Sequence, residues 1–242
     1  TAYETTAVRE NGDINATRLE AGLYGTIERG TWNAKVYNYN SERGIPGAIV
    51  NNVWRRGERV WDTNSFFQGS FVKEVNDQFK TQVNAKYAFY RTHYVNNDDK
   101  LIEVDNLYKQ REVYVSTANM YTIFPFWDVS MSYDFQWNEM KADMYGFVFP
   151  TRFTNLLSIA TALRLGKVKL QGSGLATFVN DRVKEGPAPK ARQILTPAVF
   201  LSYKPFDKHD FSLRAFYKKT FRMPTFNDLY YADMGNSKLD PE

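Results

Sequence analysis

Apolar and polar side chains alternate one by one along most of this chain. The clearest run is 127–137, where every odd position is apolar or aromatic and every even position, from Asp128 to Gln136, is polar. A period of two places successive side chains on opposite faces of a β-strand. The run therefore predicts a strand with one apolar face and one polar face.

Similar alternation recurs from one end of the sequence to the other. We count about eleven strand candidates in all. The others lie at 19–28, 83–90 and 211–218, and less clearly near 1–8, 32–40, 62–74, 110–121, 154–166, 168–180 and 193–204. No segment approaches the roughly 20 apolar residues that a membrane-spanning helix needs.

The links between these candidates alternate between long and short. Long polar links cover about 41–60, 95–109, 138–153 and 181–192, whereas short links lie near 29–31, 75–79, 122–125, 166–168 and 205–209. An up-and-down transmembrane β-barrel has long loops at one end and short turns at the other. The rhythm therefore predicts an all-β, antiparallel, up-and-down barrel.

The length of the clearest run agrees with a membrane span. Trp127 and Trp137 lie ten residues apart on one face, which is roughly 33 Å of strand. Tilted by about 40°, that strand crosses roughly 25 Å, the height of the apolar band between two aromatic girdles. The alternative is that both tryptophans belong to the core of a soluble β-sandwich.

Composition narrows the function classes. Aromatic residues make up 16% of the chain, which favours pleated strands. The absence of cysteine excludes disulfides and thiolate metal sites. The net charge of +4 is spread among many residues of both signs, so nucleic acid is not an expected partner.

We interpret both ends of the sequence as cut edges of a fragment, with a signal peptide, if any, outside residues 1–242. Thr1 begins a stretch without the features of a signal peptide, and the chain stops at Glu242. No linker or domain boundary is visible. We therefore expect residues 1–242 to form one partial barrel domain.

Three motifs connect this pattern to a known family. They are Ser41–Gly47, with the sequence S-E-R-G-I-P-G; Phe221–Tyr230, with the sequence F-R-M-P-T-F-N-D-L-Y; and the Gly235-Asn236 pair followed by Leu239–Glu242. Their order and spacing resemble those of TonB-dependent outer-membrane receptors, and the strands before them fit the same barrel. Pro224 is expected to mark the exit from a strand into an extracellular loop, because proline cannot extend a ladder.

The resemblance implies a 22-stranded barrel in the outer membrane of a Gram-negative bacterium, closed by a plug and opened by TonB. About eleven of those strands would lie in residues 1–242, without the plug, the TonB box or the C-terminal strands. The implied function is import of a scarce nutrient of the cobalamin or ferric-siderophore type. Outer-membrane lipid and a surface lipoprotein are the other implied partners; no cofactor and no enzyme activity are implied.

The strongest ligand candidates lie in the link around 53–61. Two aromatic rings beside three arginines could hold an anionic or flat polar ligand by stacking and charge. These residues are Trp54, Arg55, Arg56, Arg59 and Trp61. The alternative is a solvated or lipopolysaccharide-facing loop, with Trp61 in the upper aromatic girdle.

Metal and catalytic signals are weaker. Calcium prefers clustered hard oxygens, and one link offers four carboxylates. These are Asp98, Asp99, Glu103 and Asp105, whose spacing differs from an EF-hand and favours a solvated loop over a metal site. His93 and His209 have no recognisable triad around them, and Gly172 and Gly174 indicate a bulge or strand glycines.

Two other classes of protein remain as alternatives. A soluble β-rich carbohydrate-binding module would bury Val129, Met131, Tyr133 and Phe135 in a closed core, whereas a barrel would turn them towards lipid. An outer-membrane barrel enzyme would need a nucleophile and a base that converge, and the sequence shows none.

Overall fold

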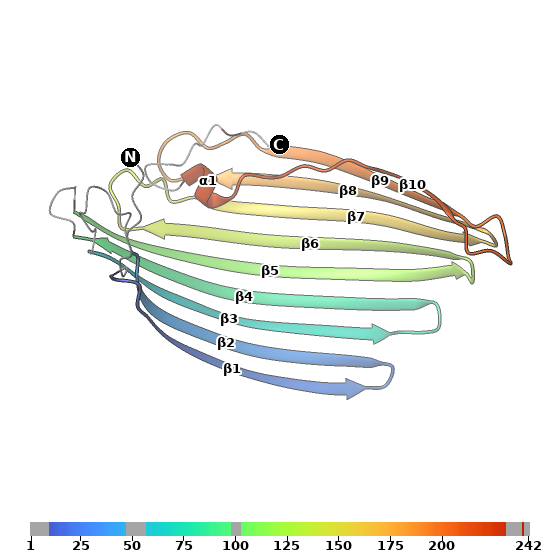
Figure 1. Cartoon of the computed structure of the whole chain (residues 1–242), viewed down its shortest axis with the longest axis horizontal. Coiled ribbons are helices and arrows are strands. Elements are labelled where there is room, and N and C mark those ends of the chain that lie inside the picture. Colours follow the sequence, from blue (N-terminus) through green and yellow to red (C-terminus); the bar gives the residue numbers. More distant parts are fainter. Residues whose placement is uncertain (1–9, 47–56, 98–102, 231–238, 240–242) are drawn as a thin grey trace, which may run out of the picture.

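The alternating segments form one antiparallel sheet of ten strands, shown in Figure 1. A computed structural model describes residues 10–46, 57–97, 103–230 and 239. The strands are β1 (Ile14–Ile27), β2 (Gly30–Gly44), β3 (Glu58–Glu74), β4 (Phe79–Asn96), β5 (Val104–Phe124), β6 (Trp127–Ala142), β7 (Thr151–Leu165), β8 (Val168–Arg182), β9 (Arg192–Tyr203) and β10 (Leu213–Lys218). One short helix follows, α1 (Phe226–Tyr230).

Each strand pairs only with its neighbours in the sequence, in the order β1 to β10. The links β2–β3, β4–β5, β6–β7 and β8–β9 lie at one end of the sheet, and the turns β1–β2, β3–β4, β5–β6 and β7–β8 lie at the other (Figure 1). We call these the long-loop end and the short-turn end. The up-and-down topology is confirmed, and so is the rhythm of the links except between β9 and β10, where the expected short link is the longer segment 204–212.

The register is continuous apart from a shift near Thr122 and Phe124, between β5 and β6. Gly172 pairs with Thr161 and Gly174 with Ile159 in the regular ladder of β7 and β8, so both are strand glycines and not a bulge.

Most strands are longer than the alternation predicted, whereas β10 begins only at Leu213 and is shorter than its candidate at 211–218. β5 extends beyond the candidate at 110–121 at both ends, and β3 begins at Glu58 inside the expected link. Ten of the eleven candidates form strands, and the candidate at 1–8 lies outside the described residues. The sequence did not predict α1, because its five residues are too few to show a helical period.

The two faces of the sheet differ in chemistry. The face that carries Trp127, Met131 and Trp137 is the outer face, and the face that carries Asp128 and Asp134 is the inner face. On the outer face Met131 is 52% exposed and Tyr133 is 40% exposed. No second sheet in the described part of the chain covers these side chains. The soluble sandwich with a closed core was therefore the wrong alternative.

None of the described helices has the length and apolar character required to cross a bilayer.

Pro197 determines where β10 stops pairing with β9. The last paired residue of β10 is Lys218, opposite Ala198. One residue further, the Lys219 N–H still donates to the Pro197 carbonyl at 3.1 Å. Proline has no N–H to return the second bond of that pair, so the ladder ends there. The chain leaves the sheet edge after this point.

Candidate functional site

Residues 219–230, which we call the inner strap, cross the inner face of the sheet at the long-loop end. In Figure 1 α1 lies over the sheet near the ends of β7 and β8. The helix begins with a reciprocal cap: the Asp228 N–H donates to Thr225 Oγ1 at 3.2 Å, and the Thr225 N–H donates to Asp228 Oδ2 at 2.8 Å. The Thr225 N–H, and then its hydroxyl, lower the pKa of the Asp228 carboxyl. The cap fixes the direction of the strap.

The apolar side of the strap closes a small core against the sheet. Buried residues of the strap pack on inner-face residues of β5 and β6 and on the following loop. The cluster contains Tyr108, Met140, Ala142, Phe147, Phe226, Leu229 and Tyr230. This apolar group marks where the strap docks on the inner face.

A buried ion pair holds the strap from the side of β7 and β8. Arg152 donates two parallel hydrogen bonds of 2.7 Å to the two oxygens of Asp181, and a third of 2.7 Å to the Pro224 carbonyl. Its guanidinium also lies 5.1 Å from the centre of the Phe226 ring. Bidentate pairing of this kind fixes the relative orientation of the two side chains and also strengthens their attraction.

Tyr230 completes this network. Its hydroxyl donates to Asp181 Oδ2 at 3.1 Å. Burial, and then the neighbouring Asp181 carboxylate, raise the pKa of the Tyr230 phenol. The phenol therefore stays protonated and remains a donor.

A cavity of about 480 Å³, the rim cavity, lies between residues 221–226 of the strap and the inner face of β5–β8. Its polar wall contains neutral groups, one carboxylate and the Arg152 guanidinium, which Asp181 already pairs: Gln110, Glu112, Gln136, Asn138, Arg152, Thr154, Thr177 and Thr225. Its volume is within the range of small-molecule pockets.

Several polar side chains of this wall already have a charged or hydrogen-bonding partner within the protein. Glu112 accepts from Lys86 at 2.9 Å and from the Gln136 amide at 3.3 Å, and Gln110 donates to Asn138 at 3.5 Å. Thr177 is the exception: it is 3% exposed, and its hydroxyl has no hydrogen-bond partner among the described residues. A buried polar group without a partner is uncommon, so a ligand or water at this position would gain a hydrogen bond.

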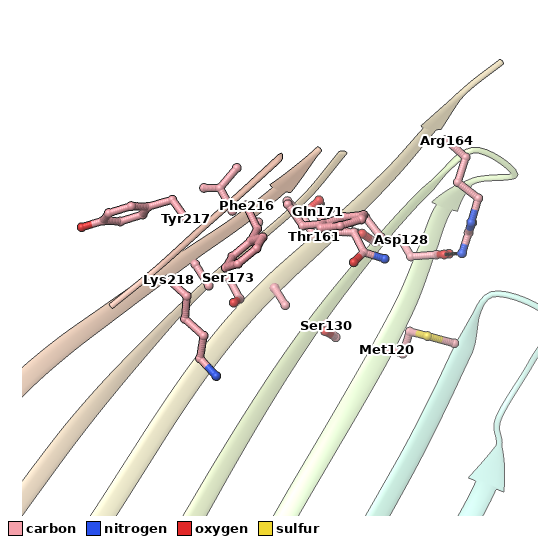
Figure 2. Close-up of a pocket in the computed structure, with 16 residues that line it drawn as sticks. Met120, Asp128, Ser130, Thr161, Arg164, Gln171, Ser173, Phe216, Tyr217 and Lys218 are labelled. Carbon is pink, nitrogen blue, oxygen red and sulfur yellow. Dashed lines mark hydrogen bonds and ion pairs between the residues drawn. The ribbon is translucent and has the colours of Figure 1, made fainter. Parts of the chain in front are cut away.

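A second cavity of about 490 Å³ lies on the inner face nearer the short-turn end, across β6–β10 (Figure 2). Small side chains such as Ser130 and Ser173 line it, and Figure 2 shows Phe216 and Lys218 pointing to the opposite side from Tyr217. Its Arg164 and Asp128 pair with each other at 2.6 Å. The two opposite charges of this cavity, on Arg164 and Asp128, therefore compensate each other, whereas Gln171 and Lys218 form no side-chain contact of this kind among the described residues.

The predicted ligand residues lie elsewhere. Arg59 and Trp61 are in β3, on the outer face with Phe67, and so on the opposite face from the rim cavity. Arg59 pairs with Asp13 at 2.8 Å and with Glu42, and the Trp61 ring lies 5.3 Å from His93. Trp54, Arg55 and Arg56 lie outside the described residues. The ligand role of these five residues stays a prediction.

The predicted calcium loop is only partly described. Asp98 and Asp99 lie outside the described residues, and Asp105 contacts His93 at 2.6 Å. Among the residues that the structure describes, no three or more His, Asp or Glu side chains come together as a metal site. Calcium binding by this loop stays a prediction.

Sequence reasoning missed the strap contacts. Pro224 was expected at the exit into an extracellular loop, but it is buried and its carbonyl accepts from Arg152 across the inner face. Arg152 and Asp181 gave no signal because each lies in or next to a predicted polar link, where single charges are common. The motif at Phe221–Tyr230 was the one available pointer.

These features together define the wall of an up-and-down membrane β-barrel, apolar outside and polar inside. The sequence model of the family described as TonB dependent receptor-like, beta-barrel matches residues 3–242, and the chain belongs to that family.

Two solved structures show the same fold. The copper transporter OprC superposes with a TM-score of 0.74 at 12% identity, covering 96% of this chain and 41% of OprC. The ferric citrate transporter FecA in its unliganded form gives a TM-score of 0.67 at 13% identity, covering 88% of this chain and 37% of FecA. The chain thus spans about two fifths of either structure. No curated protein matches the sequence.

Proposed function

We propose that this chain forms part of the barrel of an outer-membrane receptor that binds and imports a scarce nutrient in a Gram-negative bacterium. The observation that carries the proposal is the combination of an apolar outer face, a polar inner face and a rim cavity at the long-loop end. Residues 1–242 would be a partial barrel domain. TonB would supply the energy through a plug and TonB box outside these residues.

The rim cavity is the first proposed contact for the nutrient. Its amides, from Gln110, Gln136 and Asn138, both donate and accept hydrogen bonds. Lys86 compensates the Glu112 carboxylate, so the cavity carries no uncompensated charge of its own. These features suit one edge of a ligand rich in amide or hydroxyl groups, such as cobalamin or a ferric siderophore.

The link around 53–61 is the second proposed contact. Trp54, Arg55, Arg56, Arg59 and Trp61 would hold anionic or flat parts of a ligand by charge and stacking. Since Arg59 already pairs with Asp13 and Glu42, it would first have to exchange these partners. We therefore rank this contact below the rim cavity.

The test is calorimetric titration of the full receptor in detergent with cobalamin, ferric siderophores and haem. For the ligand that binds, Gln136→Ala should weaken the affinity by about tenfold, the value of one good hydrogen bond. Gln68→Ala is the matched control, because Gln68 also faces inward but lies on β3, outside the cavity.

Equal effects of the two substitutions would contradict the rim cavity as the contact while leaving the receptor class intact. Binding to none of these ligands would contradict the nutrient type. It would favour a glycan or peptide cargo that arrives with a surface lipoprotein.

A further inference from the structure

Four cations lie side by side on the outer face near the long-loop end. In the sheet register Arg91 of β4 is directly opposite Lys109 of β5, and Lys109 is directly opposite Lys141 of β6. Arg111 is the next outer-facing residue on β5. We call these four residues the cation row. Side chains directly opposite on paired strands have Cβ atoms about 5 Å apart.

The protein does little to neutralise this row. Lys141 pairs with Glu139 at 3.3 Å, in the same strand. Glu139 is also directly opposite Arg111 in the register, but Arg91, Lys109 and Arg111 form no ion pair within the part of the chain that the structure describes. Like charges directly opposite each other destabilise a sheet. The row therefore lowers the stability of the bare protein.

Some cations elsewhere in the sheet have a carboxylate of their own: Arg59 has Asp13 and Glu42, Lys86 has Glu112, and Arg164 has Asp128. Others, such as Arg214 and Lys218, form no ion pair among the described residues. The cation row differs from both groups because Arg91, Lys109 and Lys141 lie directly opposite one another, where an anion from outside the chain would relieve their repulsion.

The position of the row indicates what that partner is. The outer-facing residues just below Arg91 are Phe89 and Tyr87, and those just below Arg111 are Val113 and Val115. Consecutive residues on one face are about 7 Å apart along a strand. The cations thus lie within two such steps of the upper edge of the apolar band, at the depth of lipid headgroups.

We propose that the cation row binds the phosphate groups of an anionic lipid headgroup in the leaflet at the long-loop end. Lys109, Arg111 and Lys141 are exposed on this face. A phosphate between opposite cations would turn their repulsion into charge-assisted hydrogen bonds. The inference rests on the barrel fold and does not depend on which nutrient the receptor carries.

The test compares the full receptor with the variant R91Q/K109Q/R111Q in neutral detergent micelles. Thermal unfolding is followed while dioleoyl phosphatidylglycerol, dioleoyl phosphatidylcholine or inorganic phosphate is added. Phosphatidylglycerol alone should raise the Tm of the wild type. Each cation near an anionic lipid surface contributes about fivefold, so the variant should bind this lipid on the order of 100-fold more weakly.

The matched control is R29Q/K73Q/K80Q, which removes three cations at the short-turn end. This control should keep the phosphatidylglycerol effect. The inference is overturned if R91Q/K109Q/R111Q responds like the wild type, or if phosphatidylcholine is equally effective. A full response to inorganic phosphate would also overturn it, because the site would then bind free anions.

A single substitution keeps the test valid if the triple variant does not fold. Lys109→Gln removes the central charge between Arg91 and Lys141. Without anionic lipid it should raise the Tm by relieving repulsion, and with phosphatidylglycerol it should gain less than the wild type. A lower Tm without lipid, or an undiminished gain with it, would contradict the role of the row.

Discussion

The inner face contains ion pairs in two different environments, one covered by the strap and one open. Over β5–β8 the strap covers the long-loop end, and the side chains of Arg152 and Asp181 are 10% and 4% exposed. Over β1–β4 no described segment crosses the face, and Lys35 and Glu20 remain 31% and 39% exposed, although their 2.7 Å contact is equally short.

The comparison teaches that distance alone does not determine what an ion pair contributes. Water around Lys35 and Glu20 weakens their attraction and solvates either charge if the other is lost. Arg152 and Asp181 have given up their water, so each depends on the other. The covered region should therefore keep one arrangement, whereas the open region can tolerate change.

The largest effect is expected from Arg152→Met. It leaves Asp181 buried without a counter-charge and frees the Pro224 carbonyl, which should destabilise the docked strap by about 3–5 kcal/mol. Hydrogen exchange of the amides of residues 221–230 would measure the loss. The double variant R152M/D181L should recover much of it, and unchanged exchange in R152M would contradict the role of the buried pair.

The next effect is expected from Leu229→Ala. Leu229 is 6% exposed in the small core beneath the strap, and its truncation should cost about 2–4 kcal/mol of strap stability through lost burial and a cavity. The same hydrogen-exchange measurement applies. Leu195→Ala is the control, because Leu195 is 62% exposed on the outer face and should leave exchange of the strap unchanged.

A smaller effect is expected from pH through Asp228. Its pKa is lowered from the ordinary value of 3.8, so its contribution is fully present above that value. The contribution is lost as the pH falls through the lowered pKa of the folded state. The protection factors of the amides at the start of α1, which already account for the pH dependence of the intrinsic exchange rate, should therefore fall in this acid range. Asp228→Asn should remove the pH dependence; an unaltered profile would contradict the cap.

The smallest effect is expected from Lys35→Gln. The pair with Glu20 is solvated, so the Tm in detergent should stay within experimental error of the wild type. A loss of stability comparable to that expected for Arg152→Met would show that the inner face over β1–β4 is not open to solvent in the receptor. The comparison between the two regions would then fail.

The faces and the topology could be predicted from sequence because the signal is local. Met131 and Tyr133 alternate with Ser132 and Asp134, and a period of two assigns each to a face without knowledge of any partner strand. The positions where the strands end were harder to predict from the sequence. Near Asn106 and Lys109 both faces are polar, so the alternation vanishes while the ladder continues.

The strap could not be predicted, because its contacts join distant parts of the chain. Arg152 and Pro224 are 72 residues apart, and Asp181 and Tyr230 are 49 apart. No periodicity connects such positions. The hydroxyl of Thr177 is also invisible to sequence reasoning, since an alternating strand contains many threonines and only packing leaves this one unpaired.

The strictly consecutive pairing of the strands has a consequence for how such a wall changes over generations. A hairpin contains one strand of each direction. Gain or loss of a whole hairpin therefore keeps the up-and-down alternation and leaves every other strand with the same face towards lipid. A one-residue insertion within a strand would instead turn its remaining apolar side chains inward. Heritable variation should therefore accumulate as added or deleted hairpins and as changed loop lengths, with the strands themselves keeping their residue count.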